Sequence, residues 1–153
     1  MPKRSAGLLL HRRGDEGLEV LLVHPGGPYW AGRDDGAWSI PKGEVEAGED
    51  PLEVAFREFR EEVGLDPPDG APVHLGELRQ PSGKIVTAWA IEGDADVDTM
   101  RSNTFSMEWP PRSGVMRAFP EVDRAGWFDL ASARKKLLAG QVPFLLRLTE
   151  ALG

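Results

Sequence analysis

The stretch Gly43–Leu65, GEVEAGEDPLEVAFREFREEVGL, carries the strongest structural signal in the sequence. Asp50 can cap a helix, Pro51 suits its first position, and Glu53 completes a capping box. Gly64 near the end of the stretch and Pro67-Pro68 just after it favour a helix end there. Between these signals the apolar residues recur at helical spacing, at Leu52, Ala55, Phe56, Phe59 and Val63. The pattern predicts a helix from about 50 to 63.

Three carboxylates, Glu58, Glu61 and Glu62, fall in one sector of this helix beside its apolar stripe. Carboxylates at such spacing repel one another, and no lysine occurs between Lys42 and Lys84 to pair with them. The 43–65 stretch has eight acidic and two basic residues, a net −6 against −7 for the whole chain. Such a concentration either solvates a helix face or holds a cation. The glycine-rich loop before the helix favours a hard divalent cation, which takes oxygen ligands and bridges carboxylates to phosphates.

Composition limits the remaining alternatives. A chain of 153 residues with 41% hydrophobic residues predicts a single domain, residues 1–153. The absence of cysteine excludes a disulfide framework, a thiolate metal site and a cysteine nucleophile, and no apolar run approaches the length of a membrane span. The net charge argues against stable binding to nucleic acid or to anionic membrane. We therefore expect a soluble, cytoplasmic protein, either a monomer or a homodimer.

Alternating apolar runs and turn residues predict a set of strands around the helix. The polar stretches 24–36, 42–49 and 92–103 are expected to be loops, and a mixed β-sheet between helices, an α/β fold, is the expected architecture. The expected strands are Ser5–Arg12, Leu18–Val23, Trp38–Ile40, Val73–Arg79, Lys84–Ile91, Thr104–Trp109 and Arg124–Phe128, and the expected further helices are Leu130–Ala139, ended by Gly140, and Pro143–Leu152.

The acidic helix and its preceding loop also match a known pattern, G-x5-E-x7-R-E-U-x-E-E-x-G-U, where U is a bulky apolar residue. The matching residues are Gly43, Glu49, Arg57, Glu58, Phe59, Glu61, Glu62, Gly64 and Leu65. The stretch resembles the Nudix box of the Nudix hydrolases, with the aromatic Phe59 where an aliphatic residue is commoner. The resemblance implies an α/β/α sandwich and Mg²⁺-dependent hydrolysis, with Mn²⁺ as the alternative ion, of a nucleoside diphosphate linked to another group X.

The same resemblance implies roles for individual residues. Glu58, Glu61 and Glu62 would be metal ligands together with the carbonyl of Gly43, and Glu61 and Glu62 would take part in catalysis. Arg57 would orient the carboxylates, and Glu49 would brace the loop or helix. The general base in this family often lies outside the box. The candidates for it here are Glu121, which shortly precedes the expected last strand, then Glu108, then a box glutamate.

Substrate-binding candidates lie mainly outside the box. The lead-in Trp38–Gly43, WSIPKG, resembles that of Nudix enzymes acting on dinucleoside polyphosphates or inositol pyrophosphates. The resemblance makes Lys42 a candidate for neutralising a phosphate at the mouth of the site. Tyr29 and Trp30 are candidates for stacking on a base. Lys84 and Arg112 are further phosphate candidates, the latter in a proline-rich loop. For each of these residues a structural or merely solvated role is the alternative.

Three functions remain open at this stage. The favoured one is hydrolysis of a dinucleoside polyphosphate of the diadenosine tetraphosphate type, or of a nucleoside triphosphate. The second is cleaning of the nucleotide pool by hydrolysis of oxidised dNTPs. The third belongs to a different class, a catalytically silent nucleotide sensor, against which the intact Glu58, Glu61 and Glu62 argue.

Overall fold

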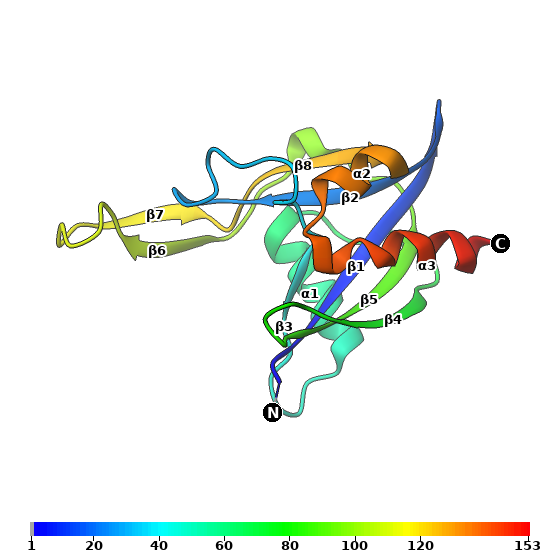
Figure 1. Cartoon of the computed structure of the whole chain (residues 1–153), viewed down its shortest axis with the longest axis horizontal. Coiled ribbons are helices and arrows are strands. Elements are labelled where there is room, and N and C mark those ends of the chain that lie inside the picture. The colour runs from blue at the N-terminus through cyan, green and yellow to red at the C-terminus, as the bar shows by residue number, and fades with distance from the viewer. Residues whose placement is uncertain (1) are drawn as a thin grey trace.

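A mixed β-sheet is the centre of the computed structural model, which describes residues 2–153 (Figure 1). The strand order is β4-β5-β1-β2-β8, and β3 also pairs with β1. β1 runs parallel to β5 and antiparallel to β2 and β3. The strands are β1 (Arg4–Gly14), β2 (Gly17–Pro25), β3 (Lys42–Glu44), β4 (Val73–Arg79), β5 (Ile85–Glu92) and β8 (Val122–Asp129).

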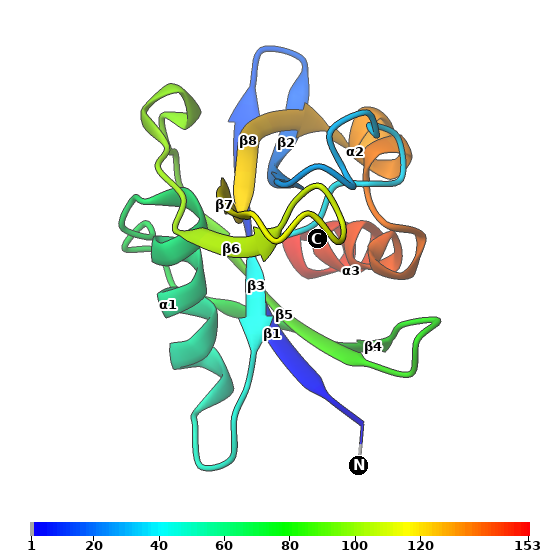
Figure 2. The ribbon, with the colours of Figure 1, turned by 90° about the vertical axis from the view of Figure 1, so that its left-hand side faces the viewer.

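Helices cover both faces of the sheet (Figure 2). On one face α1 (Pro51–Val63) packs on Leu8 and Leu10 of β1, which lie in one buried apolar cluster. Leu9 points the other way, into the cluster that contains residues of α2 (Leu130–Lys136) and α3 (Pro143–Leu152). This alternation follows from the two-residue period of a strand. The expected α/β/α sandwich is confirmed.

Two strands, β2 and β3, pair with different parts of the same edge of the central strand β1. This arrangement positions the acidic helix. β2 pairs with the C-terminal part of β1, while β3 pairs with Ser5–Gly7 near its start. Between them Leu8 donates its backbone N–H to the carbonyl of Pro41, 3.1 Å away. The register sets Gly43 opposite Ala6, a residue of the cluster under α1. The glycine loop therefore leaves the sheet directly beside the helix that follows it.

A two-stranded hairpin, β6 (Thr104–Glu108) and β7 (Met116–Pro120), projects from the body of the molecule (Figure 1). We call this hairpin, residues 104–120, the arm. The loop after β2 lies along it, because Gly27 faces the Phe105 ring and Tyr29 meets Trp109 edge-on at 5.4 Å between ring centroids. Within residues 2–153 no helix has the length and apolar character needed to cross a membrane.

Most predicted elements are confirmed, with shifted ends. The helix over 50–63, the first hairpin, the strands equivalent to β4, β5, β6 and β8, and the last helix are present. The predicted strand Trp38–Ile40 is wrong, since only isolated bridges form at Trp38 and Ser39. The predicted loop 42–49 contains β3, and β7 was not predicted. The helix predicted over Leu130–Ala139 ends at Lys136, where Trp38 hydrogen-bonds across the chain to the Lys136 carbonyl and the Leu138 N–H.

Candidate functional site

The acidic helix α1 is held firmly at both ends, which fixes the direction of its carboxylates. Asp50 caps the start by accepting a hydrogen bond from the Glu53 N–H at 3.2 Å. Gly64 ends the helix in the left-handed region, at φ 77°, a conformation that costs glycine little. A segment distant in sequence completes the cap, because the Arg101 N–H donates to the Val63 carbonyl and the Asn103 N–H donates to the Glu61 carbonyl.

Glu58 lies against the backbone of Gly43 and is more enclosed than Glu61. Its side chain is 15% exposed, whereas that of Glu61 is 40% exposed. A Cβ at position 43 would overlap the Glu58 carboxyl group, so only glycine leaves room for this approach. The Glu58 carboxyl group therefore lies directly beside the backbone of the loop that precedes the helix.

Arg57 connects the carboxylates to the loop before the helix. Its guanidinium lies 2.6 Å from Glu49, 3.8 Å from Glu58 and 3.9 Å from Glu61. Glu49 in turn accepts a hydrogen bond from the Glu46 N–H at 2.8 Å. Arg57 is thus placed to orient two carboxylates, with Glu49 holding it, as the resemblance implies for these residues.

Burial makes the charged forms of the inner carboxylates costly. It raises the pKa of Glu62 to about 8, partly offset by the nearby Lys42 ammonium. Burial also raises the pKa of Glu58, and the negative charge of Glu61 adds to the increase. Conversely, burial and then the charge of Lys84 lower the pKa of Lys42. Carboxylates that are hard to ionise by themselves gain most from a bound cation.

The residues present fit a hard divalent ion. All the donors are oxygens, from Glu58, Glu61, Glu62 and the Gly43 backbone, which is the ligand type that Mg²⁺ takes. Among residues 2–153 no three Asp, Glu, His or Cys side chains already converge closely enough to form a metal cage. Mutual repulsion explains the spread, and Mg²⁺ itself keeps several waters, so it requires few direct protein ligands. The helix spacing and the Gly43 approach support the fit.

A pocket of about 230 Å³ opens beside Glu62 and collects several of the predicted site residues. Trp30, Lys42, Glu62 and Glu121 all line it, together with residues that carried no sequence signal, namely Val23, Pro25, Ala37, Ser39, Val122 and Leu138. Glu121 is exposed, and its backbone is fixed by hydrogen bonds with Asn103 and Gly26. The pocket therefore combines an acid, a cation and an aromatic ring at the edge of the carboxylate cluster.

A second pocket of about 340 Å³ shares Lys42 and Leu138 with the first. Lys84 lines it, beside the turn between β4 and β5 and opposite Gln141. The two lysines thus line neighbouring pockets, and Lys42 belongs to both. The structure brings Lys42, Trp30 and Glu121 together in the first pocket, while Lys84 lines the second.

Arg112 and Glu108 lie elsewhere. Both belong to the arm, where the Glu108 carboxylate accepts the Arg112 N–H at 2.7 Å. Neither lines either pocket. Trp38 is 5% exposed and belongs to the apolar core, and its indole N–H donates a hydrogen bond to the Asp34 carboxylate. Its role is therefore to pack the core.

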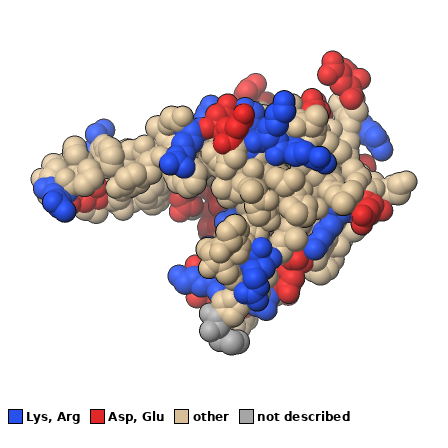
Figure 3. Space-filling view, viewed as in Figure 1, with Lys and Arg blue, Asp and Glu red and all other residues tan. Residues whose placement is uncertain are grey.

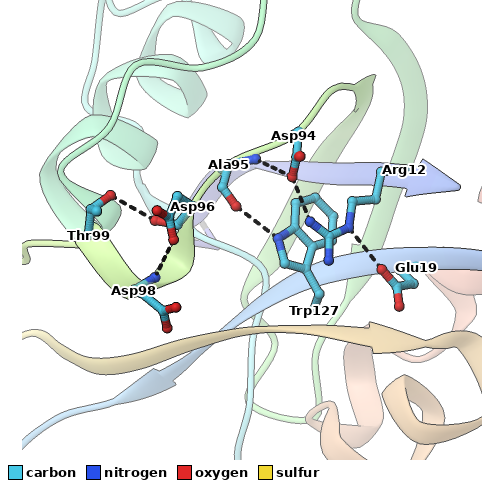
Figure 4. A network of polar contacts seen from close by, with 8 residues as sticks. All are labelled: Arg12, Glu19, Asp94, Ala95, Asp96, Asp98, Thr99 and Trp127. Atoms are coloured by element: carbon cyan, nitrogen blue, oxygen red, sulfur yellow. Dashed lines mark hydrogen bonds and ion pairs between the residues drawn. The ribbon is translucent and has the colours of Figure 1, made fainter. Parts of the chain in front are cut away.

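A larger hollow, about 470 Å³, lies at the end of the first hairpin, where Arg12 pairs with both Glu19 and Asp94. Arg12 stacks over Trp127 at 4.0 Å and pairs with Glu19 and Asp94 (Figure 4). The Trp127 indole N–H donates to the Ala95 carbonyl. These contacts tie the segment after β5 to β8 and serve stability.

Comparison with known proteins adds an independent result. The model of the NUDIX domain matches residues 1–148. An RNA pyrophosphohydrolase of Halorhodospira halophila is 55% identical over 62 residues, which is 40% of this chain and 33% of that protein. The m7GpppN-mRNA hydrolase of Saccharomyces cerevisiae is 24% identical over 84% of this chain and 11% of its own. The chain thus spans about a third or less of the curated relatives it matches here.

Solved structures match over nearly the whole chain. An Ap4A hydrolase of C. elegans, in a binary complex, superposes with a TM-score of 0.66 and 22% identity, covering 97% of both chains. The NUDIX domain of Shewanella oneidensis NrtR, complexed with ADP ribose, gives a TM-score of 0.69 and 17% identity over 100% of this chain and 90% of its own. At these identities the likeness shows the fold.

Proposed function

The chain belongs to the NUDIX family, and we propose that it is a divalent-metal-dependent hydrolase that cleaves a pyrophosphate bond in a nucleoside diphosphate linked to a further group. The observation that carries the proposal is the meeting of Glu58 with the Gly43 backbone beside a pocket that holds Lys42, Glu62 and Glu121. The site then combines oxygen ligands for a metal ion, a lysine that can bind phosphate and a carboxylate that can accept a proton from water.

Each residue of the site has a part in the reaction that its position supports. Glu58, Glu61, Glu62 and the Gly43 carbonyl would hold Mg²⁺, with Mn²⁺ as the alternative. When bound, the ion neutralises phosphate charge and stabilises charge on the attacking and leaving oxygens. Arg57 keeps two of the carboxylates oriented, because its guanidinium spans both. Lys42 and Lys84 bind phosphate oxygens in the two neighbouring pockets that they line.

Glu121 is the proposed general base. It lines the same pocket as Glu62, and its backbone is anchored on both sides. A carboxylate at this position is placed to accept a proton from attacking water. Glu108, the second candidate, is held in the arm by the Arg112 N–H, which leaves Glu121 better placed.

Among substrates we favour a dinucleoside polyphosphate. Lys42 and Lys84 in neighbouring pockets suit a phosphate chain, and Trp30, which shares a pocket with Lys42, suits a nucleobase. Ap4A is the substrate named for a protein of the same fold. RNA with a 5′-triphosphate is the second candidate because of the relative named RNA pyrophosphohydrolase, although the net charge of −7 disfavours a long polyanion.

The test is a substrate panel assayed with Mg²⁺ and with EDTA. It contains diadenosine tetraphosphate, ATP, oxidised and ordinary dNTPs, ADP-ribose, NADH and a 5′-triphosphorylated RNA. We expect metal-dependent turnover of diadenosine tetraphosphate above the others, and its loss in Glu61→Gln. Failure of every substrate, with equal results for the variant, would contradict the proposed activity.

A further inference from the structure

An aromatic run leads away from the pocket onto the arm. Trp30 lines the pocket, and its chain neighbour Tyr29 lies edge-on to Trp109 of the arm, with ring planes at 81°. Tyr29 is 62% exposed, and within residues 2–153 it is the one aromatic residue among the exposed large hydrophobic residues. An exposed tyrosine supported by a second ring presents a rigid π-surface to solvent, where a planar group can stack.

The loop that carries Tyr29 is built to lie flat against the arm. The Gly26 N–H donates to the Glu121 carbonyl at 2.9 Å, and a Cβ on Gly26 would overlap the carbonyl of Pro120. Gly27, at φ 94°, faces the Phe105 ring. The same contacts that set Tyr29 on the arm therefore also involve Glu121, so the aromatic surface is fixed relative to the pocket.

The neighbouring charges suit phosphate. Arg33 lies over the Trp30 ring at 5.6 Å, Arg117 over Phe119 at 5.8 Å, and Arg112 occupies the hairpin turn with φ 62°. Within residues 2–153 none of these arginines has a carboxylate within 4.0 Å. The far end of the arm is basic at the surface (Figure 3). Unpaired guanidiniums beside half-buried aromatic rings favour a nucleotide over an apolar protein partner.

We propose that the arm holds the second nucleoside of the substrate, whose base stacks on Tyr29 and Trp109 while the first nucleotide occupies the pocket beside Trp30. The inference rests on the proposed function, because it places the second base relative to phosphates bound at Lys42. It makes the arm the element that distinguishes a dinucleoside polyphosphate from a nucleoside triphosphate, which has no second base.

The experiment compares diadenosine tetraphosphate with ATP in four proteins. These are the wild type, Tyr29→Ala, Tyr29→Phe, which keeps the ring, and Met116→Ala. Met116 is 65% exposed and pairs with Glu108, so it faces away from Trp109 and is the matched control on the arm. KM and kcat are measured with Mg²⁺, and binding of both nucleotides is measured by calorimetry in EDTA, where metal-dependent turnover is absent.

We expect Tyr29→Ala to raise KM for diadenosine tetraphosphate about 5- to 150-fold, the range that base stacking supplies. Its kcat and the KM for ATP should change less than about twofold, and Tyr29→Phe and Met116→Ala should resemble the wild type. Equal losses on both substrates, no loss on either, or a similar loss in Met116→Ala would overturn the inference.

Two other outcomes separate this inference from competing ones. A loss confined to 5′-triphosphorylated RNA would overturn it in favour of an RNA-binding arm, and a change of oligomeric state in Tyr29→Ala with both substrates unaffected would make the surface a contact between copies. If the wild type turns over no substrate yet binds diadenosine tetraphosphate more tightly than ATP, and Tyr29→Ala removes the difference, the proposed activity fails and the arm inference stands.

Discussion

Replacing Gly43 by alanine should separate activity from stability. The added methyl group would overlap the carboxyl group of Glu58, so that side chain must move. The backbone need not, because Gly43 lies in β3 outside the left-handed region that favours glycine. The substitution thus displaces one carboxylate and leaves the strand pairing with Ala6 in place.

The expected magnitudes differ for the two properties. Displacement of a catalytic group by about 1 Å can cost about 100-fold in rate, and the overlap requires a movement of at least that order. Overpacking costs about 1–3 kcal/mol. The lower end applies here because the end of a flexible side chain can move aside, which corresponds to a fall in Tm of about 2–4 °C.

The assay is Mg²⁺-dependent turnover together with calorimetric Tm. Gly32→Ala is the matched control, since no atom lies within 4 Å of a Cβ built there and its φ is also outside the left-handed region. We expect about 100-fold lower kcat for Gly43→Ala and wild-type activity for Gly32→Ala. A Gly43→Ala protein within about threefold of wild-type kcat would refute the role assigned to the contact between Gly43 and Glu58.

Further predictions concern the cation, the pH and the surface. Glu61→Gln and Glu62→Gln should each lower kcat by more than about 100-fold in steady-state assays while Tm changes little, whereas unchanged turnover would contradict their ligand role. Mg²⁺ should raise the Tm of the wild type by binding the folded state, and Glu58→Ala should reduce that rise in a thermal shift measurement. In metal-free protein the raised pKa of Glu62 means that ionisation is costlier folded than unfolded, so this group lowers stability progressively as pH rises from about 4.5 towards about 8. The Tm of Glu62→Gln minus that of the wild type should therefore increase over this range, and a difference independent of pH would contradict it. Arg12→Ala removes the stacking on Trp127 and two ion pairs, and should lower the free energy of unfolding by about 1–2 kcal/mol with kcat unchanged. Equal Tm values for Arg12→Ala and the wild type would contradict this.

Elements that carry their own boundary signals were predictable from the sequence. Helix α1 has its cap, proline, apolar stripe and terminal glycine within one short stretch, and the structure reproduces it. Elements that depend on distant partners were not. β3 is three residues long and exists because it pairs with β1, and α2 ends early because Trp38, far away in sequence, hydrogen-bonds to its last turn. β7 is exposed at four of its five residues and lacks an alternating pattern.

The candidate site divides in the same way. Glu58, Glu61 and Glu62 share a helix sector, so their spacing alone places them on one side of α1. Placing Glu121 beside Glu62 requires the chain to return from the arm, and Leu138 joins the pocket through the early end of α2. Arg112 lies in the turn of a projecting hairpin, outside the pockets that Lys42 lines, and this separation follows from the pairing of β6 with β7. Local sequence does not encode such distances.

The most direct test of the central claim is product analysis of diadenosine tetraphosphate incubated with wild type and Glu61→Gln in Mg²⁺, resolved by anion-exchange chromatography. The account predicts ATP and AMP from the wild type, and at least about 100-fold less product from the variant. Equal product from both proteins would contradict the claim that the carboxylates of α1 carry the reaction.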